Sequence, residues 1–91
     1  MTLEYLVANI DEFDEELVIF QKDELSIDSE VILFERDEDD TVRIKDGIKY
    51  VYFLELFLAK EFIEDWVSSS NFKPNAREIA LRLLQYAIYD A

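Results

Sequence analysis

The sequence predicts an α+β fold, an antiparallel β-meander of three to four strands with one N-terminal and two C-terminal helices. Short β-branched and aromatic runs fill the first half of the chain, an Asp-Gly pair joins two of them, and helical spacing of apolar residues takes over near residue 54. The chain has 91 residues, of which 51% are hydrophobic, and this is enough for one core only. We therefore expect residues 1–91 to form a single globular domain.

The first expected element is a short helix that begins after Thr2. Thr2 is a suitable N-cap, and the apolar residues that follow it have the i, i+3, i+4, i+7 spacing of one helical face: Leu3, Leu6, Val7 and Ile10. The acidic residues between positions 11 and 16 bracket Phe13 and are expected to close this element.

Two strands are expected next. Leu17 to Phe20 is β-branched and aromatic, and charged residues follow it. Glu30 to Glu35 has the same character and is apolar on both faces, which is typical of a central strand covered on each side.

The clearest local signal is a hairpin between Thr41 and Phe53. Asp46-Gly47 is a two-residue turn of the kind that needs positive φ, and it places Arg43 opposite Tyr50. The pairing divides the hairpin into two faces. One face carries Val42, Ile44, Val51 and Phe53, and the other carries Arg43, Lys45, Tyr50 and Tyr52.

Two helices are expected at the C-terminal end. The apolar residues of the first share one face (Ala59, Phe62, Ile63 and Trp66), and Ser68 to Asn71 ends it. Pro74 cannot continue a helix, whereas Asn75 and Glu78 form a capping box for the last helix, which ends near Asp90.

Charge is distributed unevenly along the chain. There are 22 Asp and Glu residues against 9 Lys and Arg, a formal charge of −13. Residues 1–46 hold 16 acidic and 4 basic side chains, a net −12, whereas residues 47–91 hold 6 and 5, a net −1. Such a surface repels phosphate backbones, so we expect no direct binding of nucleic acid, and its natural complement is a strongly basic protein.

The residue types that most often carry catalysis are missing. The chain has no His and no Cys, and its single glycine cannot form a phosphate-binding loop. The acidic run that starts at Asp37 resembles a calcium loop, but Val42 replaces the required glycine and Ile48 replaces the bidentate Glu. We therefore expect no enzyme activity, no cofactor and no metal site.

Two acidic clusters and two tyrosines are the candidate partner-binding residues. Acidic clusters attract a basic partner, and tyrosines are favoured at the centre of interfaces. Both have a structural alternative, because charge runs also form solvated loops and the tyrosines also suit a sheet face packed under a helix. The candidates are Asp11, Glu12, Asp14, Glu15, Glu16, Asp37, Glu38, Asp39, Asp40, Tyr50 and Tyr52.

We expect a cytoplasmic protein that does not bind membranes. Positions 1–6 carry no basic leader, and Glu4 stands where a signal peptide has positive charge. The most apolar stretch, Ile48 to Val67, is interrupted by charged residues and is not a membrane span.

Three segments carry a resemblance to a known group of proteins. They are Val31-Ile32-Leu33-Phe34 followed by acids, Gly47-Ile48-Lys49-Tyr50 leading into a helix, and Lys73-Pro74-Asn75-Ala76 opening a helix that ends between Tyr86 and Ala91. Together they resemble small acidic bacterial domains encoded beside toxins, similar to the immunity proteins of contact-dependent inhibition and other polymorphic toxin systems. The resemblance implies a toxin inhibitor and assigns no individual binding residue.

Composition and resemblance together predict a non-catalytic inhibitor that neutralises a basic, nuclease-type toxin through its acidic surface. One alternative is a phage-encoded DNA mimic that inhibits a nucleic-acid-handling enzyme. A second is a structural or regulatory subunit whose acidity serves only solubility, with a homodimer formed through its neutral half by Trp66, Tyr86 and Tyr89.

Overall fold

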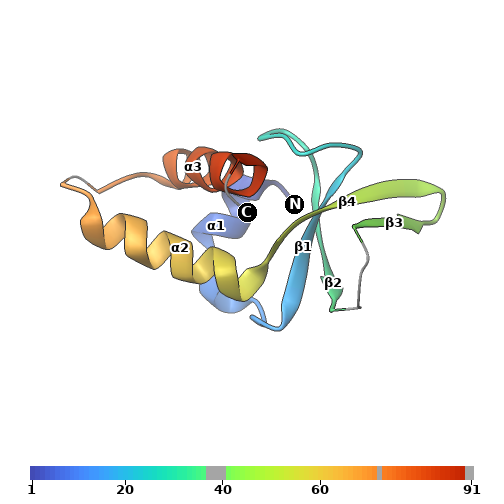
Figure 1. The fold of residues 1–91 in the computed structure, drawn as a ribbon, viewed down its shortest axis with the longest axis horizontal. Helices are drawn as coiled ribbons and strands as arrows, with labels where there is room; N and C mark the ends of the chain where they lie inside the picture. The colour runs from blue at the N-terminus through green and yellow to red at the C-terminus, as the bar shows by residue number, and fades with distance from the viewer. Residues whose placement is uncertain (37–40, 72, 90–91) are drawn as a thin grey trace.

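The computed structural model describes residues 1–36, 41–71 and 73–89 (Figure 1). The predicted α+β class is confirmed, because four antiparallel strands pack with one N-terminal and two C-terminal helices. The elements in chain order are α1 (Leu3–Ala8), the 3₁₀ turn η1 (Ile10–Glu12), β1 (Leu17–Lys22), β2 (Val31–Glu35), β3 (Val42–Lys45), β4 (Ile48–Glu55), α2 (Leu56–Ser69) and α3 (Ala76–Tyr89).

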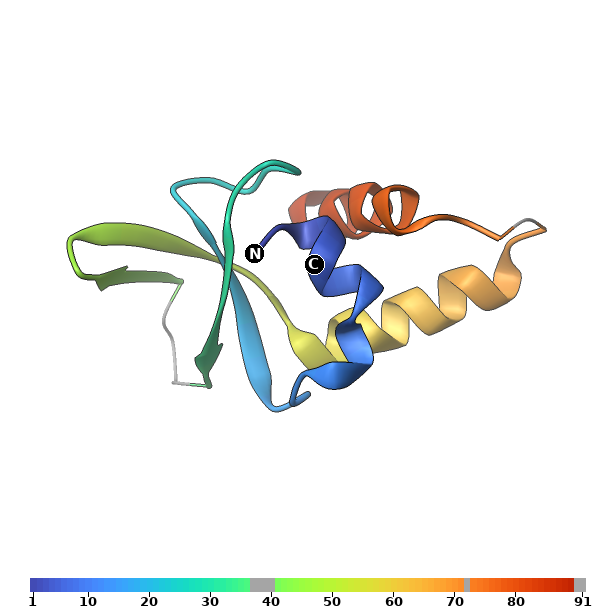
Figure 2. The same ribbon diagram turned by 180° about the vertical axis from the view of Figure 1, so that it is seen from behind.

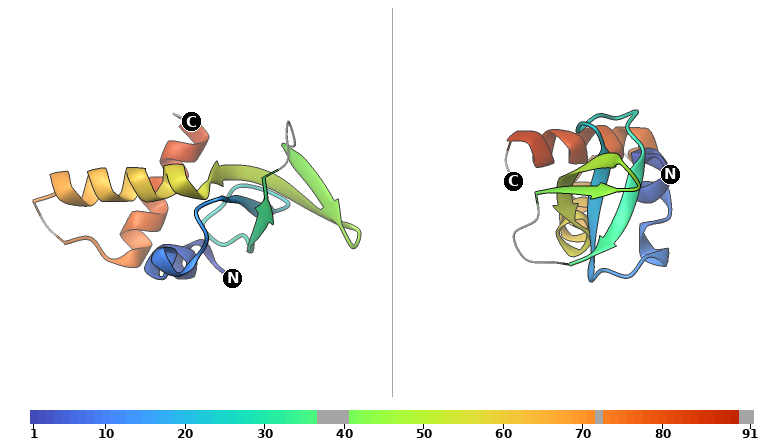
Figure 3. Two further views of the ribbon diagram at one scale, coloured as in Figure 1. Left: turned by 90° about the horizontal axis from the view of Figure 1, so that it is seen from below. Right: turned by 90° about the vertical axis from the view of Figure 1, so that its right-hand side faces the viewer.

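The strand order of the sheet is β2-β1-β4-β3, with every pair antiparallel. This order differs from that of a meander, because β1 pairs with β4 across the sheet and β2 does not pair with β3. The expectation that the Glu30–Glu35 segment is a central strand was wrong, since β2 is an edge strand. Its two faces are apolar because the sheet is curled (Figure 3), so that Val31 and Leu33 meet one apolar cluster while Ile32 and Phe34 meet another.

The predicted hairpin is confirmed in its turn and its register. Asp46 and Gly47 have φ angles of 54° and 79°, as a two-residue turn of this kind requires. Arg43 pairs with Tyr50 and Val42 with Val51, which gives the two faces expected from the sequence. The hairpin therefore extends the sheet at the end of the molecule that is remote from α2 (Figure 1).

One side of the sheet is covered by the three helices (Figure 2). The fully buried apolar residues of these helices pack on the sheet residues Ile19, Phe53 and Leu54. These helix residues are Leu3, Leu6, Leu56, Ala59, Ala80 and Leu83. Both predicted caps form. The Thr2 hydroxyl accepts a hydrogen bond from the Tyr5 amide at 3.1 Å, and Asn75 and Glu78 exchange reciprocal bonds at 2.8 and 3.2 Å.

The other side of the sheet holds an aromatic cluster. Phe20 makes edge-to-face contacts with Phe34 and Tyr52 at ring distances of 5.2 and 5.9 Å. The curled hairpin brings the guanidinium of Arg43 to 5.2 Å from the Phe20 ring and 4.8 Å from the Phe34 ring. A nitrogen of Arg43 also donates a 3.0 Å hydrogen bond to the Glu35 carbonyl, so this side chain links β3 to the end of β2.

The segment between β1 and β2 is tied down by one buried side chain. Gln21 is fully buried, and its amide nitrogen donates to the carbonyls of Ser26 and Ser29 at 2.7 and 3.3 Å. Its amide oxygen accepts from the Ser26 amide at 3.2 Å. Both polar atoms of this side chain therefore form hydrogen bonds with the main chain, as burial of an amide requires.

Candidate partner-binding surface

The first acidic cluster forms a defined turn between η1 and β1. Asp11 and Glu12 belong to η1, and the Asp14 carboxylate accepts a 3.0 Å hydrogen bond from the Glu16 amide. The Leu17 amide donates to the Asp14 carbonyl at 3.0 Å, which leads the chain directly into β1. The candidates Asp11, Glu12, Asp14, Glu15 and Glu16 are all exposed, so this cluster lies at the surface.

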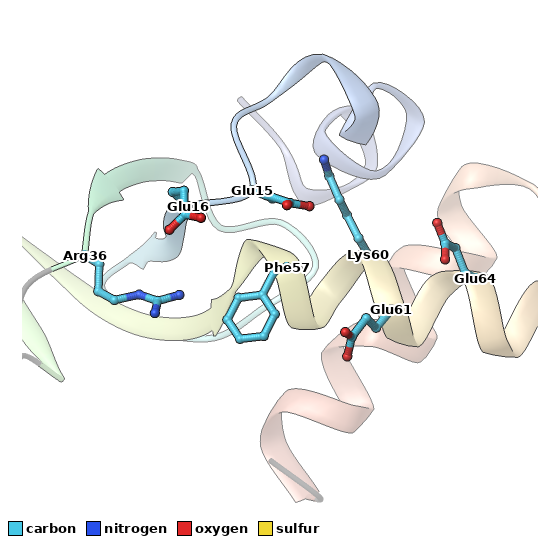
Figure 4. Close-up of a pocket in the computed structure, with 7 residues that line it drawn as sticks. All are labelled: Glu15, Glu16, Arg36, Phe57, Lys60, Glu61 and Glu64. Carbon is cyan, nitrogen blue, oxygen red and sulfur yellow. The ribbon is translucent and has the colours of Figure 1, made fainter.

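Two members of this turn face the outer side of α2 across an open groove of about 420 Å³ (Figure 4). Glu15 and Glu16 come from the turn, and Glu61 and Glu64 come from α2, so four carboxylates line one hollow. We call this set, with the other three lining residues Arg36, Phe57 and Lys60, the acidic groove. Its formal charge is −2, from four carboxylates and two cations.

The two cations of the acidic groove contact other parts of the protein. Lys60 Nζ donates a hydrogen bond to the Phe13 carbonyl at 3.3 Å, which ties α2 to the acidic turn. Arg36 Nε lies 3.7 Å from a carboxylate oxygen of Glu55, and its guanidinium lies 5.3 Å from the centre of the Phe57 ring. Figure 4 shows the Arg36 side chain extending towards that ring.

The second acidic cluster cannot be compared with the prediction. Asp37, Glu38, Asp39 and Asp40 lie outside the described residues.

The two candidate tyrosines lie in the aromatic cluster. Tyr50 is only 8% exposed, and its ring contacts Phe34 edge-to-face at 5.7 Å. A side chain so buried offers little surface to a partner, and we do not carry Tyr50 into the proposed contact. Tyr52 is half-buried, and burial raises its pKa above the ordinary 10.0, with a further contribution from the negative charge of Glu55. Tyr52 contacts the Phe20 ring and Tyr50 the Phe34 ring, and the guanidinium of Arg43 lies over both phenylalanines, where the sequence had suggested a helix.

Glu61 and Glu64 are groove residues that sequence reasoning missed. Their position opposite the apolar face of α2 could be read from the helical spacing, but they lie in the half of the chain whose net charge is only −1. Their place in the groove could be recognised only from the tertiary structure, because only the fold places α2 beside the turn that precedes β1. A surface assembled from two distant segments leaves no local signal in a charge count.

Within the described residues, no three carboxylates are grouped so that they could hold a metal ion. No helix in the described part of the chain has the length and apolar character needed to cross a bilayer. Comparison of the chain with protein-family models, with curated proteins and with solved structures found no match, so its function has to be inferred from the surface of the molecule itself.

Proposed function

We propose that this protein is a non-catalytic inhibitor, an immunity protein that binds and neutralises a basic, nuclease-type bacterial toxin. The observation that carries the proposal is the acidic groove, in which Glu15 and Glu16 join Glu61 and Glu64 from a distant part of the chain. Such an inhibitor would act in the cytoplasm, where the toxin reaches nucleic acid.

The physical basis is electrostatic attraction followed by close contact. A net charge of −13 attracts a cationic protein over about one Debye length, which is longer at low salt, and raises the association rate constant by about one to three powers of ten. The groove then offers a concave site lined by four carboxylates and the Phe57 ring. Charge sets the rate of association, whereas close contact with the Phe57 ring prolongs the complex.

The arrangement of the carboxylates favours this proposal over the two alternatives. A DNA mimic needs carboxylates that follow the regular path of phosphates, whereas these four are gathered around one hollow. Acidity that served only solubility would need no groove, since dispersed charge serves that purpose equally well.

The test uses the nuclease domain that the proposal expects to be encoded beside this protein, purified, with nucleic-acid cleavage and association kinetics as readouts. The variant Glu15→Gln, Glu16→Gln, Glu61→Gln, Glu64→Gln neutralises the groove with little change of shape. At about 50 mM salt we expect association to slow by about one to two powers of ten, and at about 500 mM salt we expect a much smaller effect.

A matched control neutralises four carboxylates in the segment between β1 and β2, namely Asp23→Asn, Glu24→Gln, Asp28→Asn and Glu30→Gln. Both variants carry a charge of −9, four units above −13, so they differ only in where the charge is removed. The control is expected to associate much faster than the groove variant. Equal rates for the two variants would show that the groove is not the contact, and failure of the unmodified protein to inhibit the nuclease would refute the proposed function.

A further inference from the structure

Lys60 lies among the four carboxylates of the acidic groove. It belongs to α2, as do Glu61 and Glu64. Figure 4 shows its side chain extending from that helix towards the turn that carries Glu15 and Glu16. A lysine beside carboxylates is favourably placed to form an ion pair. In the described part of the chain, however, no ion pair joins Lys60 to any of the four, and its hydrogen bond goes to a neutral main-chain group instead.

The contact of Lys60 lies where the acidic turn begins. Its Nζ donates a 3.3 Å hydrogen bond to the carbonyl of Phe13, 47 positions earlier in the chain. Phe13 ends η1, and the Asp14 carboxylate that follows holds the Glu16 amide at 3.0 Å, so the position of the Phe13 carbonyl is passed on to the turn. Among the described residues, the bond from Lys60 to Phe13 is the only hydrogen bond or ion pair between residues 9–16 and α2.

The acidic turn needs such a link because its charge repels the helix beside it. Two carboxylates of the turn and two of α2 line one hollow, and like charges gathered in this way repel each other, most strongly at low salt. The ring of Phe13 packs on the core and fixes the start of the turn. Lys60 adds a positive charge and a hydrogen bond on the side of the groove, and both act against the repulsion.

We propose that Lys60 is the positioning residue of the acidic groove, which keeps the turn that carries Glu15 and Glu16 against α2. The inference about geometry depends only on contacts within the chain, whereas its effect on binding rests on the proposed function. A partner that contacts carboxylates from both segments binds more tightly when both are already in place, since preorganised groups cost less to immobilise. Lys60 thus strengthens the binding of a cationic partner although its own charge repels that partner.

The sign of this charge separates the positioning role from simple electrostatics. Lys60→Met removes one positive charge and changes the net charge from −13 to −14, so charge alone would leave association with a basic protein unchanged or faster. Loss of the positioning contact has the opposite effect, because only molecules with the turn in place bind tightly. If about one molecule in three to one in ten keeps that arrangement, the Kd rises by the same factor of about three to ten.

The first arm of the experiment uses the free protein and needs no partner. Backbone amide relaxation, measured by NMR, reports the order of the Glu15 and Glu16 amides. We expect order parameters of about 0.85 in the unmodified chain and in Lys60→Arg, which keeps a cationic donor, and below about 0.6 in Lys60→Met. The amides of β1 should be unchanged in all three proteins, because that strand is held by its pairing with β2 and β4.

The second arm measures the Kd for the nuclease of the proposed function at about 0.15 M salt. The matched control is Lys49→Met, at an exposed position of the hairpin that is remote from α2 (Figure 1), and this variant has the same charge of −14. We expect Lys49→Met to bind at least as tightly as the unmodified chain and Lys60→Met to bind about three to ten times more weakly. Lys60→Arg should restore the affinity.

Circular dichroism checks that each variant is folded, and Lys60 is only half-buried at the surface of α2. An ordered turn in Lys60→Met would overturn the proposal, as would a Kd for Lys60→Met no weaker than that for Lys49→Met. Loss of order that Lys60→Arg does not restore would also count against it. If the unmodified chain binds no nuclease, the proposed function fails, while the relaxation measurements still decide the role of Lys60.

Discussion

On the helix side of the sheet, Phe53 and Leu54 lie under aliphatic residues from three helices, whereas on the opposite side Phe20 and Phe34 lie under the guanidinium of Arg43. The first side is closed by a layer of secondary structure, and the second is closed by the sheet itself as it curls. The planar guanidinium can stack on aromatic faces while its stem covers apolar surface. A chain of this size can thus bury both faces of a sheet with helices on only one of them.

The largest loss of stability is expected for a substitution on the helix side of the sheet. Leu83→Ala removes a fully buried side chain and should lower the free energy of unfolding by about 2–5 kcal/mol, measured by urea denaturation. The control is Leu81→Ala on the exposed face of the same helix. It should cost less than about 1 kcal/mol. Comparable losses for the two variants would contradict the burial assigned to α3.

The next largest loss of stability is expected for a substitution on the aromatic side of the sheet. Arg43→Met keeps an apolar stem but removes the guanidinium from the Phe20 and Phe34 rings and the hydrogen bond to Glu35, so we expect a loss of about 1–2 kcal/mol. Lys49→Met, at an exposed position of the same hairpin, is the control and should change stability little. If both variants unfold at the same urea concentration, Arg43 does not stabilise the aromatic cluster.

A smaller effect is expected at the turn that positions the hairpin over these rings. Gly47→Ala should cost about 1 kcal/mol through backbone strain alone, because Gly47 has a φ of 79° and an added Cβ would meet no atom within 4 Å. Asp46→Asn is the matched control, since asparagine tolerates the positive φ of 54° at that position. A neutral Gly47→Ala would show that the turn does not need the left-handed conformation.

The smallest effect concerns Tyr52 at alkaline pH. Burial raises the pKa of this phenol, so the folded protein retains a proton that the unfolded chain loses above pH 10.0. Stability should therefore decline as the pH rises through the raised pKa, and Tyr52→Phe should make that decline shallower. Absorbance titration of the tyrosines should show a late-titrating component in the unmodified chain that the variant lacks, and indistinguishable titrations would contradict the assignment.

Local signals in the sequence predicted most elements of the fold. Thr2, Asn75 with Glu78, and Asp46-Gly47 each determine a cap or turn within a few residues, and each lies where it was expected. The pairing of β1 with β4 could not be predicted, because it joins segments separated by the whole β2–β3 region. The apolar pattern of β2 wrongly predicted a central strand for a related reason. Because the sheet curls, this edge strand contacts an apolar cluster on each of its two faces.

The candidate surface was only partly predictable from the sequence. Glu15 and Glu16 were identified from a charge run, which is a local property. Glu61 and Glu64 join them through tertiary packing that no charge count reveals. The two faces of the hairpin were assigned correctly, but which tyrosine would be covered depended on the direction in which the sheet curls.

Gln21 has a consequence for how the segment between β1 and β2 tolerates mutation. The side-chain amide of Gln21 contacts the carbonyls of Ser26 and Ser29, which any residue type supplies, and the amide of Ser26, which any residue type except proline supplies. Changes at Ser29 should therefore be accepted, whereas Leu25 and Ile27 of the same segment pack on the core and position 21 itself has almost no freedom. Even Gln21→Glu would replace the Nε2 donor with a buried carboxylate oxygen facing two carbonyl oxygens. The replacement of this one atom should therefore destabilise the whole segment.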